Sequence, residues 1–214
     1  MSYRIVSHRH PFTSTEVLAT GLLHDGLLGP DLHPTQRLRL LRGMVAVCSA
    51  KGYASATVAD VVSAARVSRQ TFYEQFDSKE ACFLAAQDLG HRLIEAQVVQ
   101  AARGEDWEDD LAAVFRAYFA LLAAEPSLAH ATLVEALGAG AAALERRERA
   151  LVRHAELLEQ LQPLDRDLSL AIIGGINELA IAHLRAGEVE RLTALDSKAF
   201  AFARAVMQAP VHTG

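Results

Sequence analysis

The segment from Thr57 to Phe76 restricts the fold more than any other part of the chain. It reads TVADVVSAARVSRQTFYEQF, with two short stretches of helical character on either side of a break at 66–68. Thr57 is a favourable helix N-cap with Asp60 three residues later, and Ser68 is a favourable N-cap for the second stretch. Two short helices joined by so tight a turn predict a helix-turn-helix.

The rest of the sequence also favours helix. Hydrophobic residues make up 51% of the chain but aromatic residues only 6%, and Ala and Leu dominate over the β-branched runs typical of strands. Apolar residues recur at helical spacing between glycine and proline breaks. We therefore expect an all-α protein, with further helices over 35–51, 78–103, 107–124, 128–137, 145–161, 167–186 and 195–207.

Charge and breaks in the pattern divide the chain into three parts. Residues 1–33 form an N-terminal extension, expected to be a disordered arm or to contain one short helix. Residues 34–80 are expected to form a three-helix domain with the helix-turn-helix; they hold seven basic and three acidic side chains up to Lys79, a net charge of +4. Residues 81–214 carry a net charge of −7 and are expected to form a second helical domain. A basic unit within an acidic chain suits a phosphate-rich partner.

One face of the second short helix carries side chains suited to DNA. Phe72 and Phe76 are four residues apart and face inward together, which leaves Arg69, Gln70 and Tyr73 on the opposite face with Thr71 beside them. Arginine bonds guanine and glutamine bonds adenine in a bidentate manner, while hydroxyl groups suit phosphate oxygens. Ser68 at the helix N-terminus and Lys79 at the start of the next helix are further candidates for phosphate contacts.

The same residues resemble the TetR family of bacterial repressors. The resemblance covers about 45 residues in unbroken order, and it rests on Arg37, Gly52, Tyr53, Thr57, Val58, Val61, Ala64, Ala65, Val67, Ser68, Thr71, Phe72, Tyr73, Phe76, Ser78, Lys79 and Glu80. It implies a three-helix DNA-binding domain, followed by a helical domain that dimerises and binds a small effector. By this resemblance Thr57, Ser68, Tyr73 and Lys79 match phosphate-contacting positions, and Arg69, Gln70 and Thr71 match base-reading positions.

Two residues depart from the family pattern. Arg66 stands in the turn where the family usually has glycine, and a positive φ there is expected to cost about 1 kcal/mol. Arg66 also offers an extra phosphate contact. Gln75 stands where an aromatic residue or histidine is frequent, which leaves the operator sequence open.

The last two long helices are candidates for a homodimer interface. Residues 168–184 are apolar nearly all round, which indicates a helix buried on both sides. Residues 195–207 give it an amphipathic neighbour. Two copies of 167–186 and 195–207 paired about a two-fold axis are expected to form a four-helix interface; the alternative is an ordinary monomer core.

An effector site is expected among the central helices. The residues proposed to line it are Trp107, Phe115, Tyr118, Phe119, Glu135 and Asn177, with His91 and His183 also considered. Asn177 and Glu178 stand out because they are polar within an apolar helix and need partners if buried. The excess of apolar side chains predicts a hydrophobic or amphipathic ligand.

Other functions find little support in the sequence. We expect no catalytic residue, metal or cofactor, since zinc-ligand spacing, phosphate-binding loops and nucleophile elbows are absent from it. Cys48 and Cys82 are expected to be buried thiols, with a disulfide as the alternative. No apolar stretch is expected to cross a membrane, which favours a cytoplasmic protein.

The sequence thus predicts a ligand-released repressor that binds operator DNA as a dimer. The alternatives are a DNA-binding regulator without a small-molecule effector, and a helical ligand-binding protein.

Overall fold

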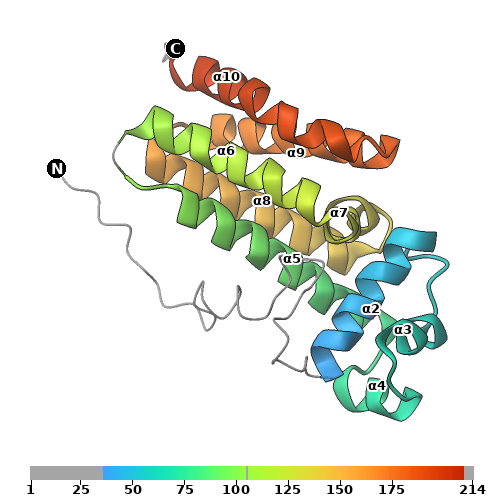
Figure 1. Ribbon diagram of the computed structural model, residues 1–214. Helices are drawn as coiled ribbons and strands as arrows, with labels where there is room; N and C mark the ends of the chain where they lie inside the picture. Colours follow the sequence, from blue (N-terminus) through green and yellow to red (C-terminus); the bar gives the residue numbers. More distant parts are fainter. Residues whose placement is uncertain (1–35, 105, 210–214) are drawn as a thin grey trace.

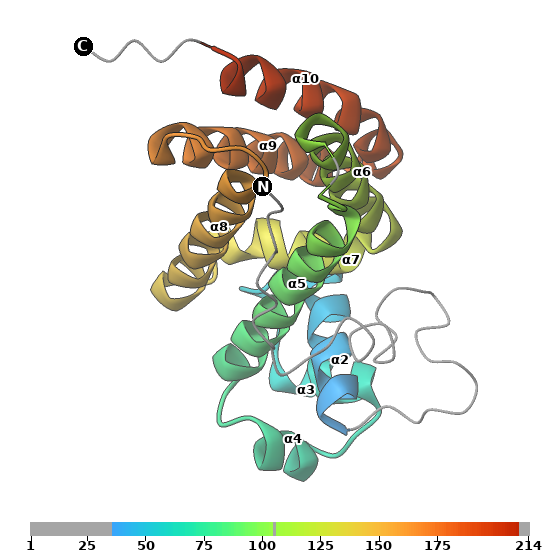
Figure 2. The ribbon, with the colours of Figure 1, turned by 90° about the vertical axis from the view of Figure 1, so that its left-hand side faces the viewer.

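The computed structural model describes residues 36–104 and 106–209, and within these ranges it holds helices and no strand. The predicted all-α fold is confirmed. The expectations for residues 1–33 lie outside the described residues. The short helix α4 (Arg69–Gln75) and the last helix, α10 (Asp196–Met207), lie at opposite ends of the molecule (Figures 1 and 2).

Three helices form a small unit around one core. These are α2 (Gln36–Lys51), α3 (Val58–Ala65) and α4. The caps follow the sequence signals: Thr57 and Asp60 form a reciprocal capping box at α3, and the Ser68 hydroxyl accepts from the Thr71 N–H at α4. The core of this unit includes Leu40, Met44, Val61, Phe72 and Phe76.

Gly43 lets α2 and α3 approach closely. A Cβ at this position would lie 2.8 Å from the carbonyl oxygen of Val61 and 3.1 Å from the backbone nitrogen of Ala65. Both neighbours are backbone atoms, which side-chain rotation cannot move. A glycine is therefore required if α3 is to sit at this distance from α2.

Helix α5 (Lys79–Ala101) belongs to two cores. Its first half contributes Cys82, Phe83 and Ala86 to the core of the three-helix unit, and its second half contributes Leu93, Ile94 and Val98 to a second core. Cys82 and Cys48 are both buried and unbonded, as expected. Burial raises the pKa of each thiol to about 12, so neither is a reactive thiolate at neutral pH.

The second core lies among the remaining long helices. Helix α6 (Trp107–Ala124) packs against α5 and α10, while α8 (Ala141–Leu161) packs against α5 and α9 (Arg166–Ala186). A 3₁₀ segment, η3 (Val189–Leu195), connects α9 to α10 and buries Leu192 and Leu195. The hydrophobic contacts of this core join α6, α8, α9 and α10 to the second half of α5.

The single helix expected over 128–137 is three short turns. They are α7 (Pro126–Ala129), the π-helical η1 (His130–Val134) and the 3₁₀ segment η2 (Glu135–Leu137). The segment packs against α2 and α5. A Cβ on Gly90 of α5 would lie 2.0 Å from the Thr132 hydroxyl, so the π turn and the glycine together allow this close contact.

Helix α9 is not buried on both sides within one chain. It buries seven residues, including Ile172 and Asn177, but exposes a stripe of residues at helical spacing: Ala171, Gly175, Glu178 and Ala182. By length and mean hydropathy, which is 1.3, it is the one helix among the described residues that is long and apolar enough to cross a membrane. Core helices of soluble proteins meet the same criterion, and α9 packs against α8 and α10.

Candidate nucleic-acid interface and ligand cavity

Helix α4 presents one polar face to solvent. Phe72 and Phe76 are buried in the core, whereas Arg69, Gln70 and Tyr73 are exposed. Arg69 Nη2 donates to the Tyr73 hydroxyl at 3.3 Å, and Gln70 Nε2 donates to Glu74 at 3.0 Å. The face expected from the sequence is therefore assembled on the protruding helix of the molecule (Figure 2), with its donors restrained only by neighbours on the same helix.

The predicted phosphate-contacting hydroxyl groups have a structural task as well. Ser68 Oγ lies 2.9 Å from Thr71 Oγ1 while it caps α4. The Thr57 hydroxyl is bonded to the Asp60 carboxylate, which also accepts from the Thr57 N–H and pairs with Lys51. These contacts, Lys51 first, lower the pKa of Asp60 to about 2. The contact with phosphate stays a prediction for Thr57 and Ser68, as it does for Tyr73.

Arg66 adopts the left-handed conformation that its position in the turn suggested. Its φ is 53° and its ψ 48°, and it is the one non-glycine residue with positive φ among those described. Its carbonyl oxygen accepts a hydrogen bond from Arg39 Nη2. For an arginine this conformation costs about 1–2 kcal/mol relative to the right-handed region, and its side chain is exposed.

Two arginines on α2 hold the helix-turn-helix from behind, a role that the sequence did not reveal. Arg39 binds the turn at Arg66, and Arg37 Nη1 donates to the carbonyl of Gln75 at 2.7 Å. The Arg37 guanidinium also lies 4.2 Å from the centre of the Phe76 ring. Both arginines bind carbonyl groups at the ends of helices, where they are unpaired, so part of the local positive charge positions α4.

Lys79 is positioned by the neighbouring loop. Its ammonium donates to the carbonyl oxygens of Tyr53 and Ala56, both at 2.9 Å, and lies 4.2 Å from the centre of the Tyr53 ring. An ammonium has three protons, so one remains for another partner. The proposed phosphate contact stays a prediction, but the main task of Lys79 in the structure is to join α5 to the loop before α3.

A cavity of about 180 Å³ lies between α5, α6, α8 and α9. Four of the six residues predicted for an effector site line it: Trp107, Phe115, Tyr118 and Asn177. Tyr118 donates to Asn177 Oδ1 at 3.2 Å, deep in the second core. The Nδ2 atom of Asn177 is buried and has no hydrogen-bond partner among the described residues.

Helix α8 contributes to the cavity, although its sequence gave no indication of this. His154, Leu157, Leu158 and Leu161 all line the cavity, but they lie on a helix whose charged residues gave no sign of a ligand site. Burial, and the charge of Arg153, lower the pKa of His154 to about 4, while Glu95 opposes the shift. The imidazole is therefore neutral at pH 7, so one of its nitrogens donates a hydrogen bond and the other accepts one.

Two predicted effector residues lie elsewhere. Phe119 is fully buried in the core, with its ring edge-on to Tyr118, and does not line the cavity. Glu135 accepts a hydrogen bond from the backbone N–H of Tyr53 at 2.6 Å and lies 3.6 Å from His130 Nδ1. The carboxylate thus joins η2 to the loop between α2 and α3. His91 and His183 also lie outside the lining.

The three-helix unit and the start of α5 match a known family. Residues 40–86 match the model for bacterial regulatory proteins of the tetR family. This part of the chain is therefore a DNA-binding domain of the tetR type. No curated protein sequence matches the chain.

Solved structures of TetR-like regulators share the fold over most of the chain. The fatty acid degradation regulator FadR from Bacillus halodurans is 22% identical, with a TM-score of 0.71 over 85% of this chain and 100% of that one. FadR from Bacillus subtilis, solved with stearoyl-CoA, is 20% identical, with a TM-score of 0.68 over 80% and 97%. A tetR-family protein from Rhodococcus RHA1 is 18% identical, with a TM-score of 0.65 over 83% and 100%.

Proposed function

We propose that the chain is a TetR-family repressor whose α4 lies in the major groove and which a small apolar or amphipathic ligand releases from its operator. The observation that carries the proposal is the placement of a cavity on α5, the helix that also begins beside the helix-turn-helix. Arg69, Gln70 and Thr71 read base edges, while Thr57, Arg66, Ser68, Tyr73 and Lys79 contact phosphates.

The repressor acts as a homodimer through α9 and α10. Support comes from the exposed stripe of α9 and from Phe202 of α10, whose side chain is 46% exposed and lies 3.8 Å from the Cβ position of Gly175. A two-fold pair of these helices would bury this surface. It would also place two α4 helices in successive major grooves, which are about 34–36 Å apart.

Ligand binding acts through the shared helix. A ligand against Ile94 and Val98 pushes on the second half of α5, and the first half is tied to the loop before α3 through Lys79. The Glu135–Tyr53 hydrogen bond is a second connection. A ligand that prefers a different angle of α5 therefore favours a dimer with the wrong half-site spacing.

A gel shift on the DNA upstream of the chain's own gene tests the operator part of the proposal. Arg69→Ala should weaken binding to the cognate site by about 1–3 kcal/mol and relax its base preference. Arg149→Ala removes an exposed arginine of α8, a helix that is not part of the three-helix unit, and is the matched control. Equal binding by both variants and the unmodified protein would refute this placement of α4.

Analytical ultracentrifugation tests the dimer. Phe202→Glu should produce monomers that lose operator affinity, because a charge in an apolar interface has no partner. Val152→Glu on α8, where the side chain is 37% exposed, is the control and should remain dimeric. A dimeric Phe202→Glu protein would move the interface elsewhere.

We infer no catalytic activity and a cytoplasmic location, as is general for soluble members of the family. A regulator without an effector is the second candidate. It gains support if operator affinity is unchanged across a broad set of apolar ligands.

A further inference from the structure

Among the described residues, the cavity lining contains carboxylates but no lysine or arginine. Its two ionisable side chains other than His154 and Tyr118 are the carboxylates of Asp106 and Asp110. Asp110 accepts from the backbone N–H groups of Arg103 and Gly104, but the Arg103 guanidinium is not part of the lining. An anionic ligand would thus meet carboxylates without a counter-ion, which is costly in a largely apolar site.

The cavity reaches the surface where this negative charge lies. Its exposed lining residues are Val99, Gly104, Asp106 and Gln160, which all belong to the end of α5, the start of α6 and the end of α8. Glu108 and Asp109 follow in the first turn of α6. A ligand that enters here passes the acidic start of α6.

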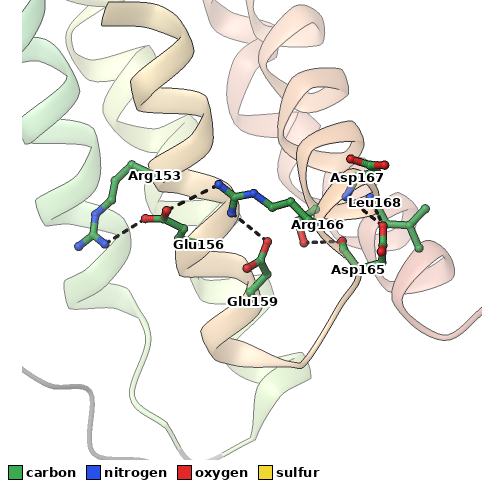
Figure 3. Close-up of polar contacts among 8 residues, drawn as sticks. Arg153, Glu156, Glu159, Asp165, Arg166, Asp167 and Leu168 are labelled. Atoms are coloured by element: carbon green, nitrogen blue, oxygen red, sulfur yellow. Dashed lines mark hydrogen bonds and ion pairs between the residues drawn. The ribbon is translucent and has the colours of Figure 1, made fainter.

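Three arginines of the neighbouring helices already have acidic partners. Arg153 pairs with Glu95. It also pairs with Glu156, and Arg166 pairs with Glu156 and Glu159 (Figure 3). Arg204 pairs with Glu108. To bind a phosphate group, each of these guanidinium groups would first have to give up a carboxylate, so none is available as a ready anion site.

The inner part of the cavity offers a neutral hydrogen-bond donor. Asn177 is 7% exposed; its Oδ1 accepts from Tyr118, and its Nδ2 is buried without a partner. A buried amide N–H that lacks a partner has lost its hydrogen bonds to water without a replacement, which is unfavourable. A ligand oxygen placed against Nδ2 would remove this penalty, and a ligand without an acceptor would not.

The volume of the cavity limits the ligand to a moderate size. Its roughly 180 Å³ is a little larger than the cavity of about 150 Å³ that accepts benzene in an engineered protein. It is smaller than the roughly 300–1,000 Å³ typical of sites for drug-sized ligands.

We propose that the effector is an uncharged apolar molecule of moderate size, whose carbonyl or similar oxygen accepts a hydrogen bond from Asn177 Nδ2, and not a phosphate-bearing thioester. This inference rests on the proposed ligand-responsive function and names the chemical class of the ligand. It separates this chain from the Bacillus subtilis regulator that was solved with stearoyl-CoA.

Three ligands with the same acyl chain test the proposal on the full-length protein. Octanamide is uncharged, octanoate carries a carboxylate, and octanoyl-CoA carries phosphates. Isothermal titration calorimetry should show octanamide binding at least about tenfold more tightly than either anion. Equal or tighter binding of octanoate or octanoyl-CoA, or no binding of octanamide, would overturn the inference.

Variants locate the contact. Asn177→Leu should weaken octanamide binding about tenfold, because it removes the donor at nearly constant volume, while Gln100→Leu, an exposed position of α5 outside the lining, should not change it. Asp106→Asn keeps a good N-cap and should strengthen octanoate binding. If a folded Asn177→Leu protein binds octanamide unchanged, the proposed contact between Asn177 Nδ2 and the ligand oxygen is wrong. If that variant does not fold, Asp106→Asn decides: an unchanged octanoate affinity would show that the carboxylates do not disfavour anions.

Operator release is measured separately by gel shift. If octanoyl-CoA binds and releases the operator, the proposed repressor function stands and the ligand class is wrong. If octanamide binds but the operator complex persists, the ligand class stands and the release mechanism is wrong.

Discussion

The two ends of α5 lie in parts of the molecule that differ in how completely their polar groups are hydrogen-bonded. Around the helix-turn-helix, charged side chains bind backbone carbonyl groups: Arg37, Arg39 and Lys79 each hold a loop or a helix end. In the cavity, Asn177 Nδ2 is buried without a hydrogen-bond partner among the described residues, and elsewhere on α5 and η1 the same holds for both ring nitrogens of His91 and for the Thr132 hydroxyl. The first part is fixed for presentation of α4, and the second retains unsatisfied groups that a ligand or a rearrangement can satisfy.

The largest expected difference between the two parts is in their stability toward acid. Burial is the main cause that lowers the pKa of His91 to about 3, and the charges of His154 and Arg147 act in the same direction. Burial also lowers the pKa of His154 to about 4; Glu95 opposes this shift and Arg153 adds to it. Between these values and the ordinary 6.5 the unfolded chain binds protons that the folded chain does not. Stability from the neutral histidines is therefore full above pH 6.5 and falls, by roughly 1 kcal/mol per histidine and pH unit, as the pH decreases toward 4.

The fluorescence of Trp107, the one tryptophan of the chain, follows this change because Trp107 lines the cavity. We expect the cavity part to unfold at a higher pH than the three-helix unit. In the three-helix unit the pKa of Asp60 is lowered to about 2. The stability that Asp60 contributes is therefore lost only as the pH falls below the ordinary carboxyl pKa of 3.8. His91→Leu should shift the fluorescence midpoint to lower pH. A signal that is constant down to pH 4 would contradict the prediction.

Removing a buried ring from each core compares the two parts directly. Phe72 and Phe119 are both fully buried, one in each core, and each change to Ala should cost about 3–5 kcal/mol in the free energy of unfolding. Phe72→Ala should abolish operator binding while octanamide still binds, and Phe119→Ala should impair ligand binding more. Urea unfolding and both binding assays check this; loss of both activities in both variants would mean that the cores fold only as one unit.

The contact between α2 and α3 allows a smaller, steric test. Gly43→Ala places a Cβ 2.8 Å from the Val61 carbonyl, and overpacking of this kind costs about 1–3 kcal/mol. Operator affinity should fall along with stability, since α3 braces α4. Gly138→Ala is the control, because nothing lies within 4 Å of its Cβ position and its φ of −112° suits alanine. Equal urea midpoints for the two variants would show that α2 and α3 can separate at no cost.

The smallest expected effect concerns the connection between the two parts. Glu135→Gln weakens the hydrogen bond to the Tyr53 N–H by removing its charge. Operator affinity without ligand should change little, whereas the factor by which a ligand weakens it should change by about 0.5–2 kcal/mol. Arg146→Gln on α8, which alters an ion pair with Asp88, is the control. Identical ligand responses of the two variants would restrict the coupling to α5.

The sequence predicted the helix-turn-helix well because its signals are local. Thr57, Asp60 and Ser68 act within one helical turn, and the buried face of Phe72 and Phe76 follows from a spacing of four. The left-handed conformation of Arg66 was suggested by the resemblance to a family that usually has glycine at this turn position. Contacts of this range depend on residues that lie next to one another in the chain.

The parts that the sequence did not predict depend on distant residues. Lys79 binds carbonyl groups 23 and 26 residues away, and Glu135 binds an N–H 82 residues away, so neither role has a local pattern. His154 reaches the cavity only because α8 packs against α5 and α9. The π turn at 130–134 likewise reflects the contact of Thr132 with Gly90, not the propensity of its own residues.

The placement of α5 in both cores has a consequence for how sensitive the regulator is in a cell. Coupling free energy between two binding sites is reciprocal: a ligand that weakens operator binding tenfold is itself bound tenfold more weakly by the operator complex. A promoter with a strong operator therefore responds at a higher ligand concentration than one with a weak operator. One chain of this design can thus set different induction thresholds at different genes through the operator sequence alone.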